Sequence, residues 1–108
     1  MTRPIRITVL KRAFHEDLLG PPLTEKTIQH LDRCADFHEG QEFLLEGPLP
    51  EKPEGFCDGA WCDIQKHVYI VAFGGTFPST DPPGICYACC TDGLRPVTFR
   101  IEPVVDYV

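Results

Sequence analysis

The sequence has no long apolar segment. Its longest clear apolar run, residues 68–73, falls far short of the ~20 residues that a membrane-spanning helix needs. The N-terminus also lacks the roughly 7–15-residue apolar stretch of a secretory signal. These absences predict a protein that does not use a membrane as a partner, and they make the cytoplasm its expected location.

Basic residues are scarce. Ten Lys and Arg face 16 Asp and Glu, which gives a formal net charge of -6. Nucleic-acid binding needs clustered Lys and Arg to neutralise phosphates, so nucleic acid is not an expected partner. The one local cluster comprises Arg3, Arg6, Lys11 and Arg12, and we interpret it as a solvated face of a strand. The oligomeric state stays open.

Several familiar catalytic motifs are missing as well. No Gly-rich phosphate loop is present, because Gly74-Gly75 follows a predicted helix instead of opening one. The serines and threonines show no nucleophile elbow. No organic cofactor is therefore expected. Six cysteines in 108 residues are also fewer than the ~8–10% of secreted disulfide scaffolds, so we expect reduced thiols or metal ligands.

The length fits a single domain, residues 1–108. A period of two, as in half-buried strands, runs through Ile5–Lys11, where Ile5, Ile7 and Val9 alternate with Arg6, Thr8 and Leu10, and again through Val97–Glu102. Gln41–Glu46 and Ile85–Thr91 are two further expected strands, and Asp92-Gly93 favours a hairpin turn.

The clearest helix is expected over Asp58–Phe73. An apolar stripe at helical spacing runs along it, formed by Ala60, Trp61, Ile64, Val68, Val71 and Ala72. A short helix is expected from Thr24, its N-cap, to Arg33. The predicted fold class is α+β: a small, mainly antiparallel sheet, open or curled into a partial barrel, with one principal helix.

Cys57 is the first candidate for chemistry. It precedes the principal helix, where unpaired amide N–H groups and the positive end of the dipole favour a thiolate. The negative charge of Asp58 opposes this effect. The alternative is a buried cysteine that acts only as a small apolar residue.

Three further cysteines cluster at Cys86-x-x-Cys89-Cys90. Because side chains alternate along a strand, Cys86 and Cys90 should share one face and Cys89 should point to the other. This spacing disfavours a simple metal knuckle or redox pair.

A site assembled across the fold fits the cysteines better. Cys34, Cys57 and Cys89 or Cys90 come from separate segments, and a fourth ligand could be Cys62, His38 or His67. Such thiolate and imidazole sets suit zinc, and thiolates also hold iron. The alternative is that these cysteines are unrelated core residues.

Four other residues each allow two interpretations. Asp63 and His67 are one helical turn apart, so they could form a catalytic acid–base pair or a plain surface pair. Arg95 could clamp a substrate carboxylate or form a surface salt bridge. Trp61 lies on the apolar stripe, so it is a core residue or a platform for substrate stacking.

These motifs resemble a family of small, Cys-rich, uncharacterised proteins of about a hundred residues from bacteria and fungi. The family has no assigned activity, and its pattern implies that Cys34, Cys57 and the Cys89-Cys90 pair are its important cysteines. The matching stretches are Ile7–Arg12, Cys34–Phe43, Lys52–Cys57, Ala60–Ile64, Ala72–Phe77, Cys89–Val97, and the residues Phe99, Ile101 and Glu102.

Three functions follow as hypotheses. The leading one is a small-molecule enzyme without an organic cofactor, of the isomerase, cyclase or lyase type. Its proton transfer would take place in a pocket between the sheet and the N-terminus of the principal helix, lined by the thiols and carboxylate of Cys57, Asp63, Cys89 and Cys90. The second is a zinc or iron module held by cysteines. The third is a non-catalytic interaction protein whose cysteines serve stability alone.

Overall fold

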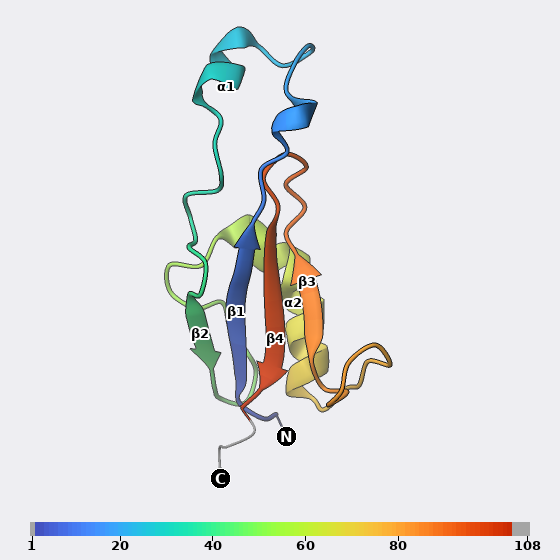
Figure 1. The fold of residues 1–108 in the computed structure, drawn as a ribbon. Helices are drawn as coiled ribbons and strands as arrows, with labels where there is room; N and C mark the ends of the chain where they lie inside the picture. The colour runs from blue at the N-terminus through green and yellow to red at the C-terminus, as the bar shows by residue number, and fades with distance from the viewer. Residues whose placement is uncertain (1, 105–108) are drawn as a thin grey trace.

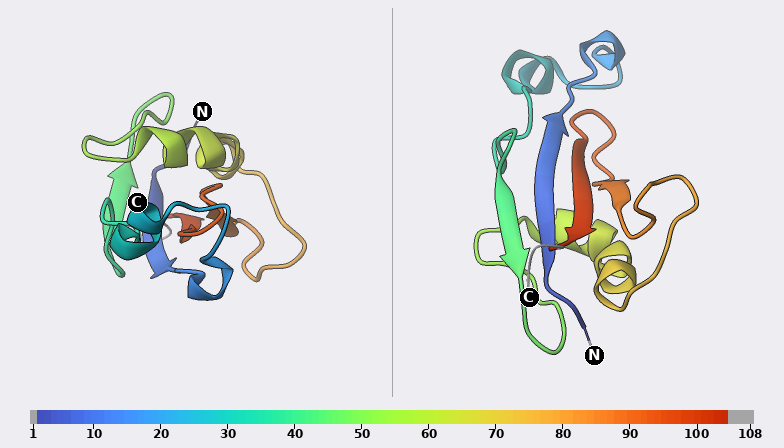
Figure 2. Two further views of the ribbon diagram at one scale, coloured as in Figure 1. Left: turned by 90° about the horizontal axis from the view of Figure 1, so that it is seen from above. Right: turned by 60° about the horizontal axis from the view of Figure 1, so that its bottom comes forward.

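The computed structural model describes residues 2–104, which form one four-stranded antiparallel sheet in the order β2-β1-β4-β3 (Figure 1). The strands are β1 (Ile5–Arg12), β2 (Glu42–Leu45), β3 (Cys86–Cys89) and β4 (Val97–Pro103). The principal helix, α2 (Asp58–Ala72), covers one face (Figure 2). The predicted α+β class is confirmed. The sheet stays open, with β2 and β3 at its edges.

The covered face holds the core. Ile5, Ile7 and Val9 of β1 are fully buried, and so are Val97, Phe99 and Ile101 of β4. Cross-strand pairing keeps these residues on one side, because directly opposed residues of an antiparallel pair project to the same face. The intervening residues of β4 remain half-buried on the other face. The strict alternation in the sequence is therefore the pattern of a sheet covered on one side.

Helix α2 buries its apolar stripe against this face. All six residues of the predicted stripe are buried. The helix ends as expected, because Gly74 adopts a left-handed φ of 87° just past the C-cap. The predicted and observed helices differ only at Phe73, which is the C-cap.

An aromatic cluster fills the space between the first turn of α2 and the sheet. The rings of Phe37 and Phe56 lie 5.0 Å apart, and each packs against Phe99, at 5.2 and 5.6 Å. Trp61 contacts Phe56 edge-to-face. These rings fix the chain before α2 and the segment before β2, which together supply much of the candidate site.

A long excursion separates β1 from β2. It contains a 3₁₀ turn (Glu16–Leu18) and α1 (Glu25–His30), and it projects beyond the end of the sheet (Figure 1). Thr24 caps α1 as predicted, with its Oγ1 accepting from the Thr27 amide, but the helix ends before Arg33. Neither helical segment of this excursion has a buried residue. Within residues 2–104, no helix has the length and apolar character to cross a bilayer.

A β-bulge near the end of β1 reverses the direction of its last side chains. Val9 pairs with Phe99 of β4, but the next paired residue is Lys11, so Leu10 is an extra residue. Past the bulge, Arg12 pairs with Val97 and therefore shares the face of Val97, toward α2. The interpretation of Arg12 as part of a solvated strand face is wrong, because the alternation on which it relied is interrupted at Leu10.

Replacing Phe99 with alanine should cost about 3–5 kcal/mol of unfolding free energy, because the ring is fully buried among Phe37 and Phe56. Leu44→Ala is the control: Leu44 is 57% exposed on the uncovered face, and its loss should cost about 1 kcal/mol or less. Urea unfolding followed by the fluorescence of Trp61, the single tryptophan, measures both. Equal costs would contradict the assignment of the core.

Candidate functional site

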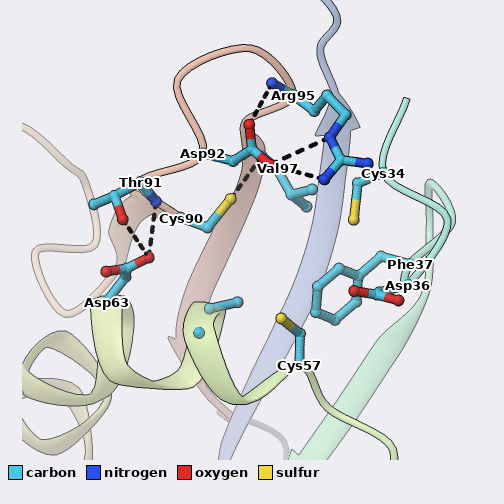
Figure 3. Close-up of a pocket in the computed structure, with 12 residues that line it drawn as sticks. Cys34, Asp36, Phe37, Cys57, Asp63, Cys90, Thr91, Asp92, Arg95 and Val97 are labelled. Atoms are coloured by element: carbon cyan, nitrogen blue, oxygen red, sulfur yellow. Dashed lines mark hydrogen bonds and ion pairs between the residues drawn. The ribbon is translucent and has the colours of Figure 1, made fainter. Parts of the chain in front are cut away.

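A cavity of about 280 Å³ opens at the N-terminal end of α2 (Figure 3). Three elements form its wall: the first turns of α2, the β3–β4 connection, and the segment before β2 that carries Cys34 and Phe37. The thiols of Cys34, Cys57 and Cys90, which are far apart in sequence, all line it. The structure therefore gathers three of the predicted site cysteines around one space.

Cys57 is the N-cap of α2, and its side chain makes no capping hydrogen bond. The unpaired amides of the first helical turn therefore lie next to a free thiol. The positive charge of Lys52, whose Nζ lies 2.6 Å from Asp58 Oδ1, offsets the predicted opposition from Asp58, and the same contact lowers the pKa of that carboxyl below its ordinary 3.8, so the carboxylate is maintained. The environment of Cys57 is thus less negative than the sequence alone suggests.

Gly59 lies beside Cys57 in the first turn of α2 and lines the cavity. Its backbone does not require glycine, because its φ is not in the left-handed region. A Cβ at this position would meet only the Sγ of Cys57, at 3.9 Å. Sequence reasoning missed this residue; a glycine within a predicted helix, where it costs about 0.5–1 kcal/mol relative to alanine, was the available signal.

Cys90 continues the β3–β4 ladder into the cavity. Its amide donates to Val97 O at 3.1 Å, and the Val97 amide donates to the Cys90 Sγ at 3.3 Å. This N–H donor stabilises electron density on the sulfur. Cys86 is buried and burial raises the pKa of its thiol, whereas Cys89 is exposed and pairs with Thr98 on the opposite face. The alternation predicted for the three cysteines is therefore present, and Cys89 does not reach the cavity.

Asp63 ties this connection to α2. Its Oδ2 accepts hydrogen bonds from the Thr91 amide at 2.7 Å and from the Thr91 hydroxyl at 3.0 Å. The contact spans two elements and fixes the residue that follows Cys90. Pairing of Asp63 with His67, predicted from their helical spacing, is wrong, because Asp63 turns to Thr91 instead.

His67 lies outside this cavity. It borders a smaller hollow of about 220 Å³ with Phe77, Cys86 and Tyr87. Its Nδ1 is buried without a hydrogen-bond partner within residues 2–104, and burial, with the nearby charge of Lys66, lowers the pKa of His67 below its ordinary 6.5. The imidazole therefore favours its neutral form and does not face the three thiols.

Asp92 and Arg95 form a salt bridge with each other at the hairpin turn. Asp92 Oδ1 accepts from the amides of Leu94 and Arg95, which is the expected turn chemistry. Asp92 Oδ2 receives Arg95 Nε at 3.2 Å and Nη2 at 3.1 Å. Burial alone would raise the pKa of Asp92, but these amides and the guanidinium outweigh it and lower the pKa. Of the two predicted roles of Arg95, the structure forms the salt bridge.

Arg12 holds the third wall of the cavity. Its Nε lies 3.0 Å and 3.1 Å from the two carboxylate oxygens of Glu39, and its Nη1 donates to Cys34 O at 2.9 Å. The bulge at Leu10 makes both contacts possible, because it turns Arg12 toward this side of the sheet. Hydrogen bonding from the Arg12 side chain lowers the pKa of Glu39 below its ordinary 4.5.

The remaining predicted site residues separate into core and surface. Trp61 is 8% exposed and belongs to the core, so it is not a stacking platform on the cavity wall. Cys62 and His38 are exposed and do not line the cavity. Among residues 2–104, no three His, Cys, Asp or Glu side chains lie close enough together to hold a metal ion. Zinc or iron binding by the cysteines stays a prediction.

Comparison with known proteins gave no relatives. The chain matches no family model, no curated protein and no solved structure. The resemblance to a family of small Cys-rich proteins therefore stays a prediction, and the geometry of the cavity is the basis for inferring a function.

Replacing Arg12 with glutamine should raise the amide hydrogen exchange of His38 and Gly40, which donate to Gln41 Oε1 and Val9 O, several-fold, because the contacts of Arg12 with Cys34 O and Glu39 that steady this segment are lost. Lys11→Gln is the control, since Lys11 is exposed and faces the other side of the sheet. In the wild type, the stabilisation from Glu39 is fully present above its ordinary pKa of 4.5 and is lost as the pH falls through the lower folded value. Protection factors that stay the same both in Arg12→Gln and in the wild type at low pH would contradict the role of Arg12.

Proposed function

We propose that the protein is a small-molecule enzyme that transfers protons without an organic cofactor, as an isomerase, cyclase or lyase. The observation that carries the proposal is the presence of two thiols, Cys57 and Cys90, on different walls of one cavity (Figure 3). Thiols from separate elements can act on two sides of a bound molecule. A pair of this kind can serve as general acid and general base.

The local dipoles support these roles. Cys57 lies at the amino end of a 15-residue helix, and Cys90 Sγ accepts the Val97 amide. Backbone N–H groups therefore lie beside both sulfur atoms, where they can donate hydrogen bonds to a group that has given up its proton. Asp63 acts on Cys90 indirectly, by holding Thr91, so we assign it a positioning role.

A proton shift at this site balances without a co-reactant. The thiolate of one cysteine takes a proton from a substrate carbon, so a C–H bond breaks and an S–H bond forms. The electron pair left behind moves within the substrate. The thiol of the other cysteine then gives its proton to a second position of the substrate, and the two sulfur atoms have exchanged protonation states.

The size of the cavity limits the substrate. About 280 Å³ equals the volume of roughly nine water molecules at ~30 Å³ each. It lies close to the roughly 300 Å³ lower end of ligand sites. Phe37, Ala60 and Val97 supply apolar surface on its wall. These features favour a compact substrate with a short carbon skeleton.

Exchange of substrate C–H for C–D in deuterated water tests proton transfer before the reaction is known. The purified protein is incubated with mixtures of small carbon acids in D₂O, with and without EDTA, and mass spectrometry detects incorporated deuterium. Loss of one acid–base group should slow the exchange by about 10²-fold or more in Cys57→Ser and in Cys90→Ser. Cys62→Ser and Cys89→Ser are matched controls, because both thiols are exposed and outside the cavity.

Two outcomes would decide against this function. Undiminished exchange in the Cys57→Ser, Cys90→Ser double variant would remove the thiols from the reaction. Exchange that EDTA abolishes in the wild type would instead favour the zinc or iron hypothesis, which elemental analysis of the untagged protein would then test.

The Gly59→Ala substitution should raise stability and lower the rate of deuterium exchange, so it distinguishes the two effects. Alanine should stabilise α2 by up to about 1 kcal/mol, because glycine is a poor helix former. The added methyl group occupies the cavity next to the Cys57 Sγ, so deuterium exchange should slow at least several-fold. Gln65→Ala is the control on the exposed surface of the same helix. A more stable variant with unchanged exchange would show that this part of the cavity does not receive substrate.

A further inference from the structure

The charged groups on the cavity wall are mostly acidic. Asp36, Asp63 and Asp92 contribute carboxylates, and Arg95 is the single basic residue among the lining side chains. The thiols and the apolar surface define the site, whereas these charges decide which molecules it accepts. Ligand binding then depends on which of these four groups are not already paired within the protein.

Arg95 is already engaged. Its Nε and Nη2, which form one edge of the guanidinium, both point to Asp92 Oδ2, at 3.2 and 3.1 Å. Asp92 also accepts two backbone amides through Oδ1. A substrate carboxylate would have to displace Asp92 from this edge. The pair therefore neutralises itself and leaves the other two carboxylates to set the charge of the cavity.

Asp36 and Asp63 have acceptor capacity to spare. Within residues 2–104, Asp36 takes part in no hydrogen bond or ion pair that involves its side chain, and Asp63 uses only Oδ2, toward Thr91. The amino end of α2 contributes the equivalent of about half a positive charge. That is less than the two formal negative charges, so the cavity carries a net negative charge.

We infer that the substrate of the proposed enzyme is a small molecule with a protonated amine. The inference rests on the proposed function and adds the chemical class. An ammonium group can donate to Asp36, whose two carboxylate oxygens are both free within the described part of the chain, while a short carbon skeleton lies against Phe37. Asp63, on the other side of the cavity, adds to its negative charge (Figure 3).

Three four-carbon probes of different charge test this inference. We titrate n-butylamine, 1-butanol and butyrate into ¹⁵N-labelled protein at pH 7, in low-salt buffer with EDTA, and follow the amides of Gly59 and Thr91. n-Butylamine should shift both amides and bind at least about three-fold more tightly than either other probe, as expected for one partly exposed ion pair. Added salt at 0.3 M should weaken amine binding, because it screens exposed charges.

Asp36→Asn should weaken n-butylamine binding by about three-fold or more, since it removes one charge without changing the size of the side chain. Asp17→Asn is the matched control, an exposed aspartate on the 3₁₀ turn away from the cavity. Unchanged affinity in Asp36→Asn, equal binding of the three probes, or no shift of the two amides would overturn the inference. The proton-transfer function is judged separately, because its deuterium exchange with uncharged or anionic carbon acids would survive all three results.

Discussion

The whole arrangement depends on a sheet that has one covered face. The apolar stripe of α2 has a single place to be buried, against Ile7, Val9 and Phe99 of the two central strands. This packing fixes the position of the first turn of α2 relative to the end of β3. The cavity forms where these two ends meet, so its thiols are held by the most stable part of the molecule while they remain accessible. Loops supply its outer wall, as is common for binding sites on rigid scaffolds.

The local patterns could be predicted from sequence, and the contacts between distant segments could not. A period of two identified β1 and β4 and placed Cys89 and Cys90 on opposite faces, because strand geometry alone decides this. A period of 3.6 identified α2 and its buried stripe. The partner of Asp63 could not be predicted, since Thr91 is 28 residues away, whereas His67 lies one turn along the same helix. The contacts of Arg12 could not be predicted either, because they depend on the bulge, and a bulge has no clear sequence signature.

The site combines features that serve stability with features that do not. The Asp92–Arg95 pair and the Asp63–Thr91 hydrogen bonds hold the β3–β4 connection in place. Gly59 and the uncapped Cys57 do the opposite, because a better helix former and a better N-cap would both strengthen α2. Such local departures from an optimal helix are characteristic of functional sites, where open space or an unpaired side chain serves function at the expense of stability.

The extra residue at Leu10 means that the register at the end of β1 decides which side chain reaches the cavity wall. Up to Val9 the strand projects its odd-numbered side chains toward α2, and beyond the bulge it projects an even-numbered one, Arg12. A regular ladder over the same residues would place Leu10 opposite Thr98 and Lys11 opposite Val97, and it would carry the guanidinium of Arg12 to the uncovered face. The segment that bears Cys34 would then lose the hydrogen bonds from Arg12, while the backbone bonds of Gly40 and Gln41 to Val9 and the pairing of the central core remained. A shift of one residue in register could thus remodel a binding site during divergence and leave the fold intact.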